Sequence, residues 1–315
     1  MNNRRSFITG LKSTKLSINE KKFLKKFKPW GVILFSRNIK SISQTKKLTD
    51  NIRMIFNDKN YPILLDQEGG RINRLYKLIN TAPFTSEYFG NLYIKDKKKF
   101  NIHYSIFINR TSFLLKQIGI NINTVPVLDI RVKGSSSIIG DRSFSHNVKI
   151  INILGNFCIN YFHKNNIGTV IKHIPGHGLA KVDSHKLTPT VNAKLSYLIK
   201  KDFSTFKNKK SIFAMTAHII YNKIDRVNTA THSKKVIQLI RDKIKFYNLL
   251  MSDDISMKSL KNSIKVNTQK AFRAGCNLVL HCNGNYKEML DVANNSPFVD
   301  NFIIKKTSQF YKILS

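Results

Sequence analysis

The chain has 315 residues, 42% of them hydrophobic, so it is long enough to bury a substantial core. Lys and Arg number 54 against 18 Asp and Glu, and the resulting charge of +36 would ordinarily indicate a nucleic-acid or anionic membrane partner. The basic residues are spread along the whole chain, however, without a basic helix, zinc-finger spacing or RNA-binding aromatic motif. We therefore expect no specific nucleic-acid partner, although a basic nucleic-acid-binding barrel without catalysis stays open as an alternative.

The cysteines and the apolar runs indicate in which cellular compartment the protein is expected. Cys158, Cys276 and Cys282 are odd in number and lie within or beside apolar runs, which argues against a disulfide framework or a cysteine-based zinc site. No apolar run reaches the roughly 20 residues that span a bilayer, and the first residues lack the apolar core of a signal peptide. We expect a cytoplasmic protein that has no membrane partner.

Short apolar runs rich in β-branched residues recur along the chain, each followed by a polar turn and an amphipathic stretch of helical period. They lie at residues 6–9, 31–35, 61–66, 122–130, 168–173, 211–218, 247–254 and 277–282. Apolar runs of this length that alternate with helices predict parallel strands buried on both faces. Eight such units predict a single (β/α)8 barrel domain over residues 1–315, and a doubly wound α/β sheet is the main alternative.

The scarce carboxylates lie where several predicted strands end. Asp66 and Glu68 end the third strand, Asp129 ends the fourth, and Asp253 and Asp254 end the seventh. In a barrel, this end of the strands carries the active site. Helix capping would explain any one of these residues, but the whole set predicts an acidic pocket at the mouth of the barrel.

The segment 172–186, KHIPGHGLAKVDSHK, concentrates histidines in a stretch too irregular for a helix or a strand. Asp183 and His185 are two residues apart, so an extended backbone would point both side chains to the same side, and the carboxylate could orient the imidazole for acid–base catalysis. A metal site that also uses His173 and His177 is possible, but no histidine pair has the helical spacing of an H-E-x-x-H site. A solvated loop without a role is the third possibility.

Six motifs carry a resemblance to a known family. In this order and spacing, DQEGGRINRL, VPVLDI, IGDRSF, KHIPGHGLAKVDSHK, MTAH and MSDDISM resemble the family 3 glycoside hydrolases, specifically the cytoplasmic bacterial β-N-acetylhexosaminidases of peptidoglycan recycling. The similarity extends from about Phe7 through Cys282. It implies a single-domain barrel that removes terminal β-linked N-acetylglucosamine from anhydro-muropeptides with retention, through a covalent intermediate. It implies no metal and no organic cofactor, and we expect a monomer.

The resemblance also assigns roles to residues. It implies that Asp253 is the nucleophile and that His185, assisted by Asp183, is the acid/base, whereas Asp254 is expected to point to the other side of the strand in a structural role. The substrate-binding residues that it implies are Asp66, Arg74, Arg142, Lys172 and His173.

The chain departs from the family pattern at three positions, and none of them removes a reactive group. These are Thr216 for the usual Pro, Ile174 for Phe and Asn277 for Asp. A metal-dependent hydrolase that uses the histidine segment stays open as an alternative, and loss of activity on chelation would distinguish it.

Overall fold

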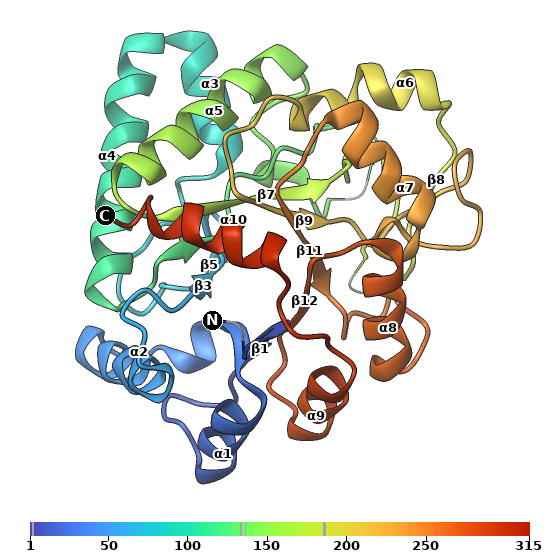
Figure 1. The fold of residues 1–315 in the computed structure, drawn as a ribbon. Coiled ribbons are helices and arrows are strands. Elements are labelled where there is room, and N and C mark those ends of the chain that lie inside the picture. The colour runs from blue at the N-terminus through green and yellow to red at the C-terminus, as the bar shows by residue number, and fades with distance from the viewer. Residues whose placement is uncertain (2, 133, 136, 185–186) are drawn as a thin grey trace.

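A computed structural model describes residues 1, 3–132, 134–135, 137–184 and 187–315 of the chain (Figure 1). Eight parallel strands close into a barrel in the spatial order β1, β2, β3, β6, β7, β9, β11, β12. Their bounds are Arg5–Gly10, Pro29–Leu34, Ile63–Leu65, Ile122–Asn123, Gly168–Ile174, Phe213–Thr216, Leu249–Asp254 and Leu278–His281. Each predicted run contributes one strand, so the predicted (β/α)8 fold is confirmed and the open doubly wound sheet is wrong.

The fourth strand is shorter than its sequence predicts. We expected a strand over residues 122–130, but β6 ends at Asn123, and beyond it only Val127 forms an isolated bridge, to Lys172. The Asn123 side chain both donates to and accepts from the backbone of Gln67, at 2.9 Å in each case, and Pro126 has no N–H to donate to a neighbouring strand. Side-chain pairing therefore replaces the regular ladder at this point of the mouth.

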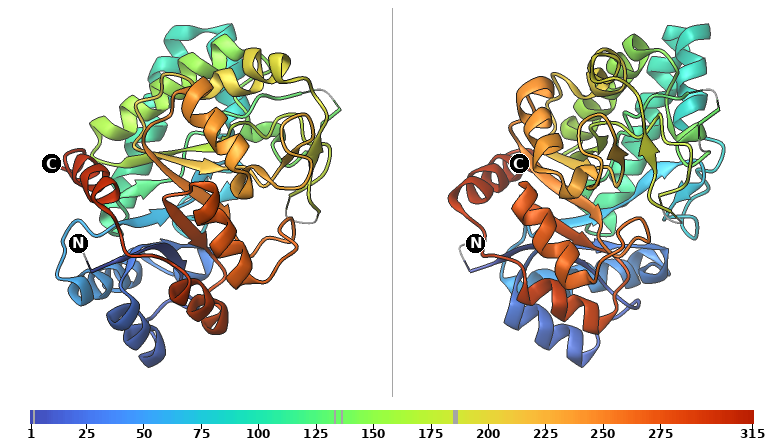
Figure 2. Two further views of the ribbon diagram at one scale, coloured as in Figure 1. Left: turned by 45° about the vertical axis from the view of Figure 1, so that its right-hand side comes forward. Right: turned by 90° about the vertical axis from the view of Figure 1, so that its right-hand side faces the viewer.

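Helices cover the outside of the barrel, as two further views show (Figure 2). In chain order they are α1 Ile18–Phe27, α2 Ile42–Phe56, α3 Ser86–Lys95, α4 Lys97–Gln117, α5 Val148–Lys164, α6 Leu195–Lys200, α7 Lys234–Leu239, α8 Ile264–Ala274, α9 Tyr286–Asn294 and α10 Asn301–Tyr311. Most begin after a Ser, Thr, Asp or Asn whose side chain accepts a hydrogen bond from the first turn, as Ser17 does from the Glu20 N–H. None of the helices in the described part of the chain is long and apolar enough to cross a membrane.

Shorter strands and helical turns lie in the loops that connect the barrel elements. Two small sheets pair β4 Gln67–Gly69 with β5 Ile72–Asn73, and β8 Thr190–Val191 with β10 Ile220–Tyr221. The short helical turns are η1 Ser36–Asn38, η2 Gly140–Arg142, η3 Asp202–Phe206, η4 Ala230–His232 and η5 Ile240–Ile244.

The barrel interior is an apolar core that α10 closes at the amino ends of the strands. Trp30 on β2 is fully buried and donates from its indole N–H to Thr307 on α10 at 2.9 Å. Phe310, also on α10, packs edge-on against Phe213 at the start of β9, with the ring centroids 5.4 Å apart. Because this end is filled, the opposite end of the barrel is the one that can hold a ligand.

Candidate active site

A cavity opens at the carboxyl ends of the strands. It brings together six of the predicted site residues, although they come from distant parts of the sequence: Asp66, Arg74, Arg142, Lys172, His173 and Asp253. The space between the lining side chains, including the part that is open to solvent, is about 700 Å³. The predicted pocket at the mouth of the barrel is therefore present in the fold.

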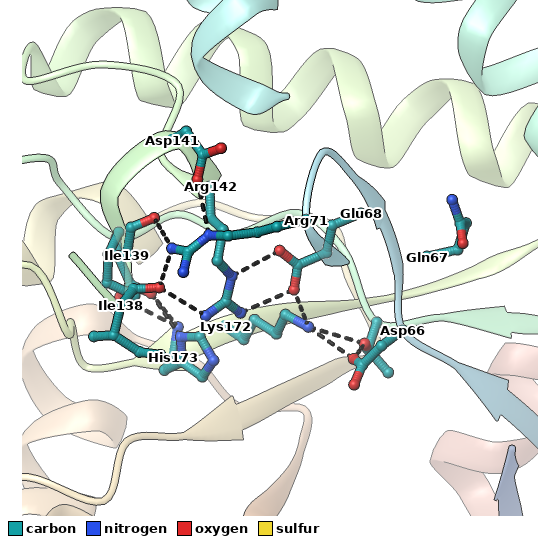
Figure 3. A network of polar contacts seen from close by, with 12 residues as sticks. Asp66, Gln67, Glu68, Arg71, Ile138, Ile139, Asp141, Arg142, Lys172 and His173 are labelled. Carbon is teal, nitrogen blue, oxygen red and sulfur yellow. Dashed lines mark hydrogen bonds and ion pairs between the residues drawn. The ribbon is translucent and has the colours of Figure 1, made fainter. Parts of the chain in front are cut away.

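A buried cluster of ion pairs forms one wall of this cavity (Figure 3). The Lys172 ammonium, on β7, lies 2.8 Å from Oδ1 of Asp66 and 2.7 Å from Oε1 of Glu68. Arg142, at the end of η2, donates two hydrogen bonds to the same Glu68, of 2.8 Å and 2.9 Å. This fork geometry fixes the plane of the guanidinium as well as its position.

The cluster is charged at neutral pH. Burial alone would raise the pKa of Glu68, but the adjacent Arg142 and Lys172 outweigh burial and lower that pKa to about 2. The pKa of Asp66 is lowered in the same way, because Lys172 and Arg74 outweigh its burial. Glu68, Lys172 and Arg142 thus stabilise one another away from water, while Asp66 and Arg74 extend the cluster to the partly exposed edge of the cavity.

Arg74 is held more loosely than the other cations. Its Nη2 lies 3.5 Å from Oδ2 of Asp66, at the limit of a hydrogen bond, and its guanidinium carbon lies 5.3 Å from the ring centre of Phe35. Asp66 also accepts from the Thr124 hydroxyl, which in turn lies 3.0 Å from the Lys172 ammonium. Arg74 therefore borders the cavity and has guanidinium N–H groups that do not donate to Asp66.

A buried carboxylate orients the histidine of the site. Asp129 is fully buried, and its Oδ2 lies 2.6 Å from Nδ1 of His173. It also accepts from the backbone N–H groups of His173 and His177. Burial would raise the pKa of Asp129, but His173 outweighs burial, and the pKa is lowered. Because the ionised carboxylate can only accept, Nδ1 of His173 carries a proton, and Nε2 is left for a ligand.

Arg71 ties the loop before Arg142 to the turn between β4 and β5. Its Nε donates to Asp141 at 2.9 Å, and its Nη2 donates to the carbonyls of Ser137 and Ile138 at 2.7 Å and 2.6 Å. Arg142 itself donates to the Ile138 carbonyl at 3.2 Å. Two arginines therefore hold this part of the loop over the site.

The two aspartates at the end of β11 both border the cavity. The Asp254 carboxylate accepts from the Ser256 backbone N–H at 3.1 Å and hydroxyl at 2.8 Å, and from the Cys282 N–H at 3.2 Å. We expected Asp254 to point to the other side of the strand from Asp253, and this orientation stays a prediction. The hydrogen bonds of Asp254 within the protein agree with a structural role.

The histidine segment is described only in part. His177 is buried, its Nε2 lies 3.1 Å from the Ser184 hydroxyl, and burial lowers its pKa to about 4. Asp183 precedes Ser184, which borders the cavity, and its carbonyl accepts from the Leu187 N–H at 3.0 Å. The predicted acid/base His185 lies outside the described residues, so the Asp183–His185 pair stays a prediction. Within the described residues, no group of three His, Cys, Asp or Glu side chains is arranged to hold a metal.

The sequence placed Glu68 and Asp129 in the predicted acidic pocket but gave neither residue a role there. Glu68 binds both Lys172 and Arg142, and Asp129 sets the proton of His173. The available signal was the position of both residues at the ends of strands in a chain poor in acids. Arg71 gave no such signal, because its partners are mainly carbonyl groups of a distant loop.

Comparison with known proteins identifies the family. The family model described as "Glycosyl hydrolase family 3 N terminal domain" matches residues 7–308. The chain is 32% identical over 262 residues to a Beta-hexosaminidase of Nitrosomonas eutropha, covering 80% of this chain and 73% of that protein. Against a Beta-hexosaminidase of Hydrogenovibrio crunogenus, identity is 30% over 281 residues, covering 88% and 78% of the two chains.

A similar fold has been solved by crystallography. NagZ from Neisseria gonorrhoeae, in complex with N-trifluoroacetyl-D-glucosamine, matches with a TM-score of 0.87 and 26% identity over 99% of this chain and 90% of that chain. A crystal of the same protein in complex with a zinc ion matches with a TM-score of 0.86, 26% identity and the same coverage. The fold and the family match agree, and this chain belongs to glycosyl hydrolase family 3 and is a glycoside hydrolase.

Proposed function

We propose that this protein is a retaining exo-β-N-acetylglucosaminidase. The observation that carries the proposal is a single cavity at the mouth of the barrel that Asp253 borders together with the buried cluster of Asp66, Lys172 and Arg142. Two comparisons support N-acetylglucosamine as the sugar that is removed. The similar curated proteins are named Beta-hexosaminidase, and the similar NagZ structure holds N-trifluoroacetyl-D-glucosamine.

Hydrolysis with retention needs a nucleophile on one face of the sugar and an acid on the other. In our proposal, Asp253 attacks the anomeric carbon and forms a glycosyl-enzyme intermediate. His185 protonates the departing oxygen and then activates water, and Asp183 orients its imidazole. The imidazole takes the place of the second carboxylate that most glycosidases use. This chemistry needs no metal or organic cofactor.

The charged wall would bind the sugar. Arg142 is fixed by Glu68, so the N–H groups that it does not use are held in place before a sugar arrives. The three N–H groups of Lys172 already meet Asp66, Glu68 and the Thr124 hydroxyl, so a sugar hydroxyl would replace one of these acceptors. Asp66 would accept from sugar hydroxyls, and the ring nitrogen of His173 that Asp129 leaves open would accept another hydrogen bond. Arg74, held only at 3.5 Å from Asp66, is the cation most able to turn toward the ligand.

For the natural substrate, we propose cell-wall fragments, namely the anhydro-muropeptides whose terminal N-acetylglucosamine is β-linked. We further propose that residues 1–315 act as one catalytic domain, as a monomer in the cytoplasm, with no specific nucleic-acid or membrane partner.

The first experiment tests the nucleophile. Purified protein is incubated with a 2-fluoro, slowly released β-N-acetylglucosaminide analogue, and the labelled peptide is identified by mass spectrometry. We expect the label on Asp253, and Asp253→Asn should abolish turnover of an aryl β-N-acetylglucosaminide without changing the melting temperature. Label on Asp254, or a product of inverted configuration by NMR, would overturn the mechanism.

The second experiment tests the acid/base. General acid catalysis is worth about 10²- to 10⁴-fold, and it matters most for a poor leaving group such as a sugar alkoxide. His185→Ala should therefore slow cleavage of a disaccharide far more than cleavage of an activated nitrophenyl glycoside, with Asp183→Ala similar but milder. A chelator should change neither rate. If instead zinc restored the wild-type rate of His185→Ala, the segment would be a metal site.

A further inference from the structure

A second cavity lies beside the candidate active site, between the small β8–β10 sheet and the start of α8. Its lining includes the polar side chains Thr188, Thr229, Ser259, Lys261, Asn262 and Lys270. In Figure 1, β8 and α8 lie on the same side of the barrel. The mechanism proposed above uses none of these side chains.

Two hydroxyls in this cavity are buried without a partner. Thr229 is 5% exposed and Ser259 is 2% exposed. Among the described residues, neither Thr229 Oγ1 nor Ser259 Oγ has a hydrogen-bond partner. A buried hydroxyl that makes no hydrogen bond costs about 1 to 3 kcal/mol, and both of these side chains line the cavity. Such a pair is what a ligand with hydrogen-bond acceptors would satisfy.

The charged side chains that line the cavity indicate which kind of ligand would bind there. Lys261 and Lys270 both line it, and no acidic side chain does so among the described residues. The nearby carboxylate of Asp225 is already engaged, because it accepts from the Asn228 side chain and from the Ser233 hydroxyl, the latter at 2.7 Å. Two ammonium groups and two free hydroxyl donors together favour an anion with several oxygens.

The second cavity is separated from the candidate active site by one turn of the chain. Met257 lines the first cavity and Leu260 lines the second, and the Leu260 N–H donates to the Met257 carbonyl at 3.0 Å. A turn closed in this way brings its ends within about 7 Å. The chain that follows the histidine segment is attached at the same place, since the Thr188 hydroxyl donates to the Ser259 carbonyl at 2.7 Å.

We propose that this second cavity binds a carboxylate of a peptide carried by the sugar on the leaving-group side of the scissile bond. The inference rests on the proposed function, because an N-acetylglucosamine bound near Asp253 would direct the rest of the substrate out of the first cavity. A peptide residue spans about 3.3 to 3.6 Å, so a few residues would reach across the turn. The cavity thereby sets a preference for acidic muropeptides over plain disaccharides.

The test compares three substrates: a muropeptide with free carboxylates, the same muropeptide with carboxamides, and an aryl β-N-acetylglucosaminide without peptide. In the wild type, the free-carboxylate muropeptide should have the lowest KM. The double variant Lys261→Met/Lys270→Met should raise that KM about tenfold, the effect of losing about 1.4 kcal/mol of binding, and should leave the other two substrates within twofold. Lys258→Met is the matched control, since Lys258 is an exposed lysine on the same turn and does not line the cavity.

A second variant separates ligand binding from a structural role. Thr229→Val keeps the shape of the side chain and removes the unpartnered hydroxyl, so it should raise the melting temperature or leave it unchanged while raising the KM for the free-carboxylate muropeptide. A structural role would lower the melting temperature and affect all substrates alike. Wild-type cleavage of free and amidated muropeptides with equal KM would overturn this inference alone. Failure to cleave the aryl glycoside would instead overturn the proposed function.

Discussion

Glu68 provides the sharpest test of the buried ion-pair cluster. Its side chain is 4% exposed and pairs with both Arg142 and Lys172. Lowering its pKa from 4.5 to about 2 corresponds, at about 1.36 kcal/mol per pKa unit, to about 3 kcal/mol of stability. The estimate agrees with the cost of removing one partner from a buried pair, about 3 to 5 kcal/mol. Glu68→Gln, which keeps the size and loses the charge, should therefore destabilise the fold at neutral pH by about this amount.

The expected shift in melting temperature follows from the length of the chain. An unfolding entropy of about 2.1 cal/mol/K per residue, over 315 residues, amounts to about 0.66 kcal/mol/K. A loss of about 3 kcal/mol should thus lower the melting temperature by about 5 °C at pH 7. The measurement is a thermal melt by calorimetry or circular dichroism on the wild type and Glu68→Gln.

The pH dependence gives a second readout with a defined sign. Because the pKa of Glu68 is lower in the folded than in the unfolded chain, its stabilising contribution is present above pH 4.5 and is lost as the pH falls toward about 2. The difference between wild type and variant should therefore shrink on acidification. Asp141→Asn is the control: its ion pair with Arg71 has side chains 36% and 41% exposed, and exposed pairs contribute about 0 to 1 kcal/mol. Equal melting temperatures for Glu68→Gln and the wild type at pH 7, or a pH-independent difference, would refute the reasoning.

Three further substitutions test other parts of the fold. Asp202 is fully buried, with no ion-pair partner among the described residues, and burial together with the nearby Asp129 raises its pKa. Ionising Asp202 in the folded chain therefore lowers the stability of the protein as the pH rises. Asp202→Asn should raise the melting temperature more at pH 7 than at pH 4. Asp129→Asn should lower the melting temperature by a few degrees and reduce kcat of the aryl glycoside assay, because a neutral amide cannot hold Nδ1 of His173 in the same way. Gly90→Ala, normally stabilising in a helix by about 1 kcal/mol, should here destabilise, because the added carbon would lie 1.7 Å from the Phe144 carbonyl oxygen; a melt that rises would contradict this packing.

The fold was predictable from the sequence because its signal is local. The run of residues 168–173 has β-branched Thr169, Val170 and Ile171 at its centre, and it becomes β7, buried along its whole length. The alternation of such runs with amphipathic stretches then limits the topology, since parallel strands need a helical crossover between them. The exception, β6, fails where side-chain hydrogen bonds of Asn123 replace the ladder, and such pairing with a distant segment leaves no local pattern.

The positions of the site residues were predictable in part, for a related reason. Strand-end location placed Asp66, Lys172 and Asp253 at one mouth, because all parallel strands end on the same face of a barrel. Which side chains bind one another there depends on loops that fold back from far along the sequence. The pairing of Glu68 with Arg142 spans 74 residues, and the second cavity is formed by three separate segments. No periodicity in the sequence encodes either of these.

The large positive charge and the acidic pocket are compatible because they belong to different environments. A lysine on the surface is solvated and costs little wherever it stands, so basic residues can accumulate there without changing the fold. In the mouth, the buried charges are paired: without Glu68, Arg142 would lose its carboxylate partner and Lys172 would keep only Asp66, and breaking such a buried pair costs several kcal/mol. The net charge of +36 is therefore a property of the solvated surface, and it carries little information about the site, where paired charges nearly cancel.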